Sequence, residues 1–132
     1  MSETKPAMNP VAWFEIYVQD MARASKFYES VLGVQLNRLD MPEGSGEMEM
    51  MGFPMVDGGP GAAGALTKMD GFKSGGNSTL VYFACEDCAT EESRIVKAGG
   101  RIQQSKTTIG QYGFMVLAID TEGNMFGLHS QK

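Results

Sequence analysis

Apolar, β-branched and aromatic residues dominate the start of the patterned part of the chain. Residues 11–18 run Val-Ala-Trp-Phe-Glu-Ile-Tyr-Val, a composition typical of a strand. Asp20 follows as an N-cap, and apolar residues then recur at helical spacing from Met21 to Leu32, just before Gly33. The pattern predicts a strand over 11–18 and a helix over 21–32 that ends at a C-terminal glycine.

The same strand, cap and helix pattern returns 67 residues later. Asp87 lies 67 residues after Asp20, and Gly100 lies 67 residues after Gly33. Residues 79–85 predict a strand and residues 88–98 a helix that begins after Asp87 and closes at Gly99-Gly100. Internal self-similarity of this kind indicates two related structural units. By the offset, Trp13 corresponds to Leu80.

Short strand-like segments separated by Pro/Gly-rich turns follow each helix. They cover residues 34–39, 47–53 and 64–68 in the first half, and 101–106, 113–119 and 125–129 in the second. Residues 71–77 form a linker between the halves. We predict an α+β fold of two βαβββ modules whose strands form a cup-shaped mixed sheet. Residues 1–10 are a tail, and 11–132 form a single domain with modules at about 11–70 and 78–130.

Two segments carry a family resemblance. Residues 13–33 hold a strand, an Asp cap and a helix with Phe-Tyr that ends in Leu-Gly, and residues 120–128 run Asp-Thr-Glu-Gly-Asn-Met-Phe-Gly-Leu. Together they resemble the opening and closing motifs of the vicinal oxygen chelate superfamily, which includes glyoxalases, bleomycin resistance proteins and extradiol dioxygenases. Thr121 stands where the closing motif usually has Pro. The resemblance implies the glyoxalase-like fold, but much less about activity.

Metal-dependent members of this superfamily take ligands from four strand positions that face the cup. The resemblance places three of them at Trp13, Leu80 and Gly127, and the fourth within 64–68, where the sequence has no His, Asp or Glu. Indole, alkyl and glycine positions cannot coordinate a divalent cation. We therefore expect a branch of the superfamily without the metal, with no cofactor.

Strand alternation predicts which residues line the cup. If position 13 faces inward, so do Glu15 and Tyr17, whereas Phe14, Ile16 and Val18 pack on the helix. The predicted lining is aromatic and apolar with a few polar groups, and Gly127 would leave room beside it. The predicted ligand-binding residues are Trp13, Glu15, Tyr17, Leu80, Tyr82, Tyr112, Met125, Gly127 and His129.

Glu15 and His129 are the candidates for acid/base chemistry. A carboxylate in an apolar strand is costly unless it is paired, so Glu15 is either a ligand anchor or general base, or a structural carboxylate. In the structural case it lies at the cup mouth, or is bonded to Tyr82 or a backbone amide. His129 could assist it, or could lie in solvent or at a dimer contact. Tyr112 lies in a glycine-flanked loop that could cover the opening.

Composition removes several classes of function. The net charge is −5 without a basic cluster, which argues against nucleic-acid binding. Residues 1–10 lack the apolar region of a signal peptide, and no run approaches the length of a membrane span, so we expect a soluble cytoplasmic protein. Cys85 and Cys88 form a Cys-x-x-Cys without a second ligand pair, and the acids between them would raise a thiol pKa; we expect structural, reduced cysteines. Most of the 11 Met residues are expected in the core or on flexible surface.

Several functions stay open at this point. The first is a metal-independent protein that binds a small apolar or aromatic molecule, as a homodimer favoured by exposed edge strands. The second is a lyase or isomerase that uses Glu15 and His129. A metal-dependent glyoxalase or dioxygenase with an atypical site, and a structural or interaction domain, complete the set.

Overall fold

The computed structural model describes residues 9–41, 43–44 and 46–132. The first eight residues of the predicted tail lie outside this range. The first half contains β1 (Trp13–Tyr17), α1 (Met21–Leu32), β2 (Asn37–Arg38), β3 (Glu49–Gly52) and β4 (Ala63–Lys68). The second half contains β5 (Tyr82–Ala84), α2 (Cys88–Ile95), β6 (Arg101–Thr108), the 3₁₀ turn η1 (Gly110–Tyr112), β7 (Phe114–Ile119) and β8 (Met125–Ser130).

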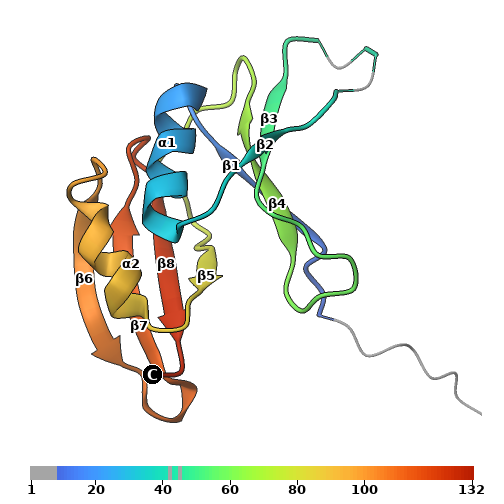
Figure 1. Ribbon diagram of the computed structural model, residues 1–132. Helices are drawn as coiled ribbons and strands as arrows, with labels where there is room; N and C mark the ends of the chain where they lie inside the picture. The colour runs from blue at the N-terminus through green and yellow to red at the C-terminus, as the bar shows by residue number, and fades with distance from the viewer. Residues whose placement is uncertain (1–8, 42, 45) are drawn as a thin grey trace, which may run out of the picture.

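Each half forms its own four-stranded mixed sheet, with the orders β1-β4-β3-β2 and β5-β8-β7-β6. The first strand of each half runs parallel to the last, and the other pairs are antiparallel. Figure 1 shows the two sheets set at an angle, with α2 across the second sheet and α1 beside it. The predicted βαβββ order is therefore present twice, in an α+β fold.

The first helix has the predicted bounds because both of its ends are fixed by local chemistry. The Asp20 carboxylate accepts a hydrogen bond from the Arg23 N–H at 3.0 Å. At the other end Gly33 adopts a left-handed φ of 68°, and its N–H donates to the Glu29 carbonyl. Hence the helix begins and ends where the sequence pattern indicates.

The second helix is shorter than predicted. Asp87 caps it through the Ala89 N–H as expected, but the helix ends at Ile95 instead of residue 98. The left-handed residue is Gly99 (φ 106°), which is not the residue that matches Gly33 by the repeat offset. The Gly100 N–H returns to the Ile95 carbonyl at 2.9 Å and closes the last turn.

Edge strands account for most of the other boundary differences. The predicted strands 34–39 and 79–85 shrink to β2 and β5, each of which pairs with a single neighbour. β6 is also an edge strand, but it extends two residues beyond the prediction, with register shifts along its pairing with β7. Apolar patterning alone therefore does not show how far an edge strand extends.

One apolar core joins the halves. Ile16 and Val18 are buried on the helix side of β1, as predicted from alternation. Aromatic rings then connect the modules: Phe14 contacts Phe83 edge-to-face at 6.0 Å between ring centroids, and Phe53 contacts Phe83 at 5.3 Å. The two halves of one chain thus pack together through the same sheet faces against which the helices lie. None of the described helices has the length and apolar character needed to cross a bilayer.

Candidate ligand-binding site

The opposite face of β1 carries three of the predicted site residues. The two oxygens of Glu15 each accept one hydrogen bond, at 3.1 Å from the Trp13 indole N–H and at 2.8 Å from the Tyr17 hydroxyl. The Tyr17 ring stacks on Phe72 with centroids 4.9 Å apart. Burial, together with the neighbouring Glu15 carboxylate, raises the pKa of Tyr17. Tyr17 therefore stays a hydrogen-bond donor at neutral pH.

A cavity of about 360 Å³ opens beside this carboxylate, beneath the linker between the halves. We call it the linker cavity. Its polar residues include Glu15, Lys73, Asn77 and Asn124, and its apolar wall includes the Phe14 and Phe126 rings. It is lined by Phe14, Glu15, Ile16, Tyr17, Tyr28, Lys73, Gly75, Asn77, Thr79, Val81, Asn124, Met125 and Phe126. Its size and mainly apolar lining are typical of small-molecule sites.

Two asparagines fix the linker over the cavity. The Asn124 side chain accepts from the Gly75 N–H at 2.6 Å and donates to the Tyr17 carbonyl at 2.9 Å. Asn77 binds both backbone groups of Met125, at 3.1 Å each. The cavity wall is consequently held by hydrogen bonds between β1, the linker and the start of β8.

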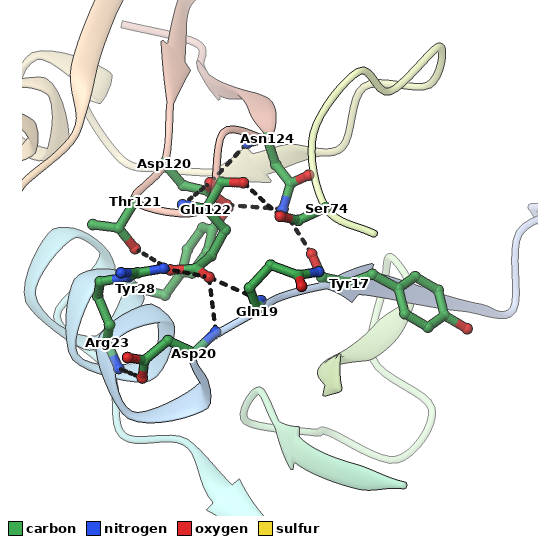
Figure 2. Close-up of polar contacts among 10 residues, drawn as sticks. All are labelled: Tyr17, Gln19, Asp20, Arg23, Tyr28, Ser74, Asp120, Thr121, Glu122 and Asn124. Atoms are coloured by element: carbon green, nitrogen blue, oxygen red, sulfur yellow. Dashed lines mark hydrogen bonds and ion pairs between the residues drawn. The ribbon is translucent and has the colours of Figure 1, made fainter. Parts of the chain in front are cut away.

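A buried carboxylate in the turn between β7 and β8, Glu122, holds the first half against this turn (Figure 2). Glu122 accepts hydrogen bonds from the backbone N–H groups of Gln19 and Asp20, both at 2.9 Å. The Arg23 guanidinium binds its two oxygens at 2.7 and 3.1 Å. The neighbouring Asp120 accepts from the buried Tyr28 hydroxyl at 2.6 Å. The acids of the closing motif thus hold the end of β1 and the start of α1 in place.

The predicted lining residues do not gather in one cavity. Glu15, Tyr17 and Met125 line the linker cavity, and Trp13 reaches it through its hydrogen bond to Glu15. A second hollow is lined by Tyr82, Ile109, Tyr112, Met115 and His129, and we call it the tyrosine basin. Leu80, which is 37% exposed, lines neither.

Gly127 does not leave the open space expected from the sequence. A Cβ atom at this position would lie 2.4 Å from the Tyr82 ring, so that ring already covers the glycine. The register explains the contact, because Tyr82 lies directly beside Gly127 on the paired strand. The absent side chain therefore makes room for Tyr82 and not for a ligand.

Glu15 and His129, the candidate acid/base pair, line different hollows. The His129 Nε2 lies 2.6 Å from the Tyr112 carbonyl, which can only accept, so Nε2 carries the proton. Glu15 bonds to Trp13 and Tyr17, and not to Tyr82 or a backbone amide, which was one of the two structural interpretations of this residue. No hydrogen bond among the described residues joins Glu15 to His129. The geometry gives no support to their acting as a pair.

Sequence reasoning missed several residues of these hollows. Lys73 and Asn77 carry no motif, since the linker around them reads only as a Gly/Ser-rich connection. Asn124 was visible in the closing motif, but only as a sign of the fold. Met115 could have been found from strand pairing, because it lies opposite His129 on β7.

Comparisons with known proteins agree with this architecture. A model of the bleomycin resistance protein-like N-terminal region matches residues 11–45. Maize glyoxalase I superposes with a TM-score of 0.72 at 21% identity, over 92% of this chain but 46% of its own. TnmS3, an antibiotic binding protein from a Streptomyces species, gives 0.64 at 24% identity, over 97% of this chain and 100% of its own. A glyoxalase/bleomycin resistance protein/dioxygenase family enzyme from Burkholderia phytofirmans gives 0.67 at 13%, over 92% and 98%.

The chain has a glyoxalase-like fold. No curated protein sequence matches it. This chain spans less than half the length of maize glyoxalase I, so the resemblance to that enzyme concerns one glyoxalase-like unit.

That Trp13, Leu80 and Gly127 occupy the metal-ligand positions of related proteins stays a prediction from the resemblance. By the same correspondence, the strand register predicts Ala65 for the fourth position, because Ala65 lies beside Glu15 as Gly127 lies beside Tyr82. In residues 9–41, 43–44 and 46–132, no three His, Cys, Asp or Glu side chains form a group that could hold a metal ion.

The two cysteines of this glyoxalase-like chain are both free thiols. Burial raises the pKa of Cys85 to about 12, and the nearby Glu91 carboxylate adds to the effect. The raised pKa was predicted, but Glu91 on α2 contributes to it and not the two acids between the cysteines. Cys85 is therefore protonated at neutral pH, and a protonated thiol is a poor nucleophile and metal ligand.

Proposed function

We propose that this protein binds a small, flat, largely apolar molecule that carries a hydrogen-bond donor. The ligand occupies the linker cavity, and Glu15 accepts its hydrogen bond without the help of a metal ion. The aromatic and aliphatic wall supplies contact area, and the carboxylate supplies orientation.

The orientation of Glu15 is the observation that carries this proposal. Trp13 and Tyr17, which hold its oxygens, belong to the same strand and face, so these bonds do not join distant parts of the fold. They use two of the roughly four acceptor positions of a carboxylate. The remaining lone pairs of a preoriented anion are available to a donor in the cavity that Glu15 lines.

The antibiotic-binding character of TnmS3 supports the same function, because that protein matches this chain over its whole length. The likeness at 24% identity is one of fold, so it suggests a class of ligand and does not name one. The flat, mostly apolar shape of the proposed ligand follows from the cavity wall itself.

A matched pair of probes tests the proposal. By isothermal titration calorimetry, 6-hydroxyquinoline is expected to bind about tenfold more tightly than 6-methoxyquinoline, because only the hydroxyl can donate to Glu15 and one such bond contributes about 1.5 kcal/mol. Glu15→Leu should remove this preference, whereas Glu86→Gln, which changes an exposed acid, should keep it. Equal affinities for both probes in the native protein would refute the donor-binding role of Glu15.

Metal independence is a separate part of the proposal and has its own test. Protein purified without an affinity tag is expected to contain far less than one equivalent of zinc, nickel, iron or manganese by elemental analysis. Dialysis against EDTA should leave the affinity for 6-hydroxyquinoline unchanged, because carboxylate and aromatic groups provide the contacts. One tightly held equivalent of metal, with binding lost on its removal, would contradict the proposal.

We also propose that the protein forms a homodimer. Trp13 and Tyr82 lie on the faces that the core leaves uncovered, and they are 40% and 47% exposed. The edge strands β1 and β5 add unpaired backbone groups beside them. Exposed aromatic residues next to sheet edges favour self-association. Size-exclusion chromatography with light scattering should give twice the chain mass at micromolar concentration; the mass of one chain would refute the dimer.

A further inference from the structure

A third hollow lies beside the contact between Phe14 and Phe83. It measures about 250 Å³ and sits where the C-terminal end of α1 approaches β5 and α2. We call it the helix-end cavity. Its wall includes Phe14, Leu32, Val34, Phe53 and Phe83, and the one ionisable residue in the lining is Glu91.

Glu91 is half-buried as a residue, and one oxygen of its carboxylate is an unused acceptor inside the protein. Its Oε1 is buried and has no hydrogen-bond partner within the described part of the chain. No ion pair of the described residues includes Glu91. A buried carboxylate oxygen without a donor is costly, and native proteins rarely keep one without a reason.

The local fold does not account for this oxygen. Glu91 lies in the first turn of α2, where the helix dipole favours a negative charge. The dipole offers no donor to Oε1, however. The adjacent Glu92 shows the contrast, because its Oε1 accepts from the Lys106 N–H at 3.1 Å and so joins α2 to β6. The protonated Cys85 thiol interacts with the Glu91 carboxylate, and this contact helps to raise the thiol pKa, but a thiol is a weak donor and brings no positive charge.

We propose that the helix-end cavity is a second ligand site, which takes a small primary amine with a single ring or a short branched alkyl group. The ammonium group donates to Glu91, and the apolar part fills the space beside Phe14, Phe53 and Phe83. An apolar cavity of about 150 Å³ can hold benzene, so 250 Å³ accepts one ring with an aminomethyl group. Aromatic walls also stabilise a cation through their ring faces.

This site is independent of the linker cavity. The two cavities share the Phe14 side chain but no polar residue. The chemistry that recognises the ligand also differs, since the helix-end cavity requires a cationic donor on a smaller molecule. An amine bound at Glu91 neither requires nor excludes a flat ligand at Glu15.

The test is a titration of ¹⁵N-labelled full-length protein with benzylamine, followed by two-dimensional NMR, with benzyl alcohol as the neutral probe. Benzylamine should shift the backbone amides of Ala84 and Glu91 saturably and bind at least about tenfold more tightly than benzyl alcohol. In Glu91→Leu the preference for the amine should disappear. Glu86→Gln removes the same charge from an exposed position and should keep it.

Three results would overturn the inference. They are unsaturable shifts, shifts confined to the linker cavity around Lys73 and Asn77, or an unchanged preference for benzylamine in Glu91→Leu. If Glu91→Leu does not fold, Glu91→Gln takes its place. It should lower the affinity for benzylamine at least tenfold, because the amide oxygen remains but the negative charge is gone. Binding of 6-hydroxyquinoline should be unchanged in either variant, which separates failure of this site from failure of the linker cavity.

Discussion

Replacing Glu122 with glutamine is expected to lower the free energy of unfolding by about 3 kcal/mol. The carboxylate is buried, and it accepts two backbone N–H groups and a bidentate Arg23 from the other half of the chain. Glutamine offers one oxygen in place of two and puts an amide N–H against these donors. Urea unfolding followed by far-UV circular dichroism at pH 7 measures the loss.

The same group predicts how stability depends on pH. Burial alone would raise the pKa of Glu122, but Arg23 and the backbone amides outweigh it and lower the pKa from 4.5 to about 2. A carboxylate whose pKa is lower in the folded state stabilises the fold fully when the pH is above its unfolded-state pKa, near 4.5. This contribution to the free energy of unfolding is lost as the pH falls toward 2. Glu122→Gln should therefore lose less stability than the native protein between pH 5 and pH 2.

The matched control is Glu86→Gln, since Glu86 is 89% exposed in its side chain and its ion pair with Lys132 spans 3.6 Å. It should leave the unfolding free energy within about 0.5 kcal/mol of the native value. If Glu122→Gln behaves like this control at pH 7, the closing motif does not lock the two halves as described.

Gly113→Ala is expected to destabilise the protein by about 4 kcal/mol, with a fall of about 10 °C or more in Tm. Gly113 precedes β7 with a φ of 105°, which L side chains rarely adopt. A Cβ there would also lie 2.4 Å from the Ser130 carbonyl oxygen at the end of β8, where backbone cannot move aside cheaply. Differential scanning calorimetry measures the change.

Gly110→Ala separates the effect of backbone strain at positive φ from the effect of the close contact with Ser130. Gly110 also has a positive φ, 69°, but no atom outside its chain neighbours lies within 4 Å of its Cβ position. Alanine there should cost about 1 kcal/mol, from backbone strain alone. Equal losses in the two variants would show that strain dominates and that the close approach of β8 to Gly113 has little effect.

Local chemistry explains which parts of the fold were predictable. Met21–Leu32 was correct at both ends because Asp20 and Gly33 act on the helix through contacts within a few residues. The predicted end of α2 was wrong because the bonding changes after Ile95: the Gly99 N–H donates to the Val96 carbonyl and the Gly100 N–H to the Ile95 carbonyl. The residue pattern does not show this change. Short strands such as β5 depend on a single partner strand, which composition does not reveal.

The candidate site was predictable only as far as strand alternation reaches. Alternation placed Trp13, Glu15 and Tyr17 on one face, and their side chains do meet through hydrogen bonds. It could not tell that Glu15 and Tyr82 would line different hollows, because that depends on the angle between two sheets. Nor could it show that the space at Gly127 belongs to Tyr82, since this follows from the pairing of β5 with β8.

The most direct measurement of ligand binding is a crystal structure of the protein soaked with 6-hydroxyquinoline. Difference density should show the ring in the cavity beneath the linker, against Phe14 and Phe126, with the hydroxyl within about 3 Å of a Glu15 oxygen. Density for the ring only at the tyrosine basin or on the surface, with Glu15 still bonded to Trp13 and Tyr17 alone, would contradict the account.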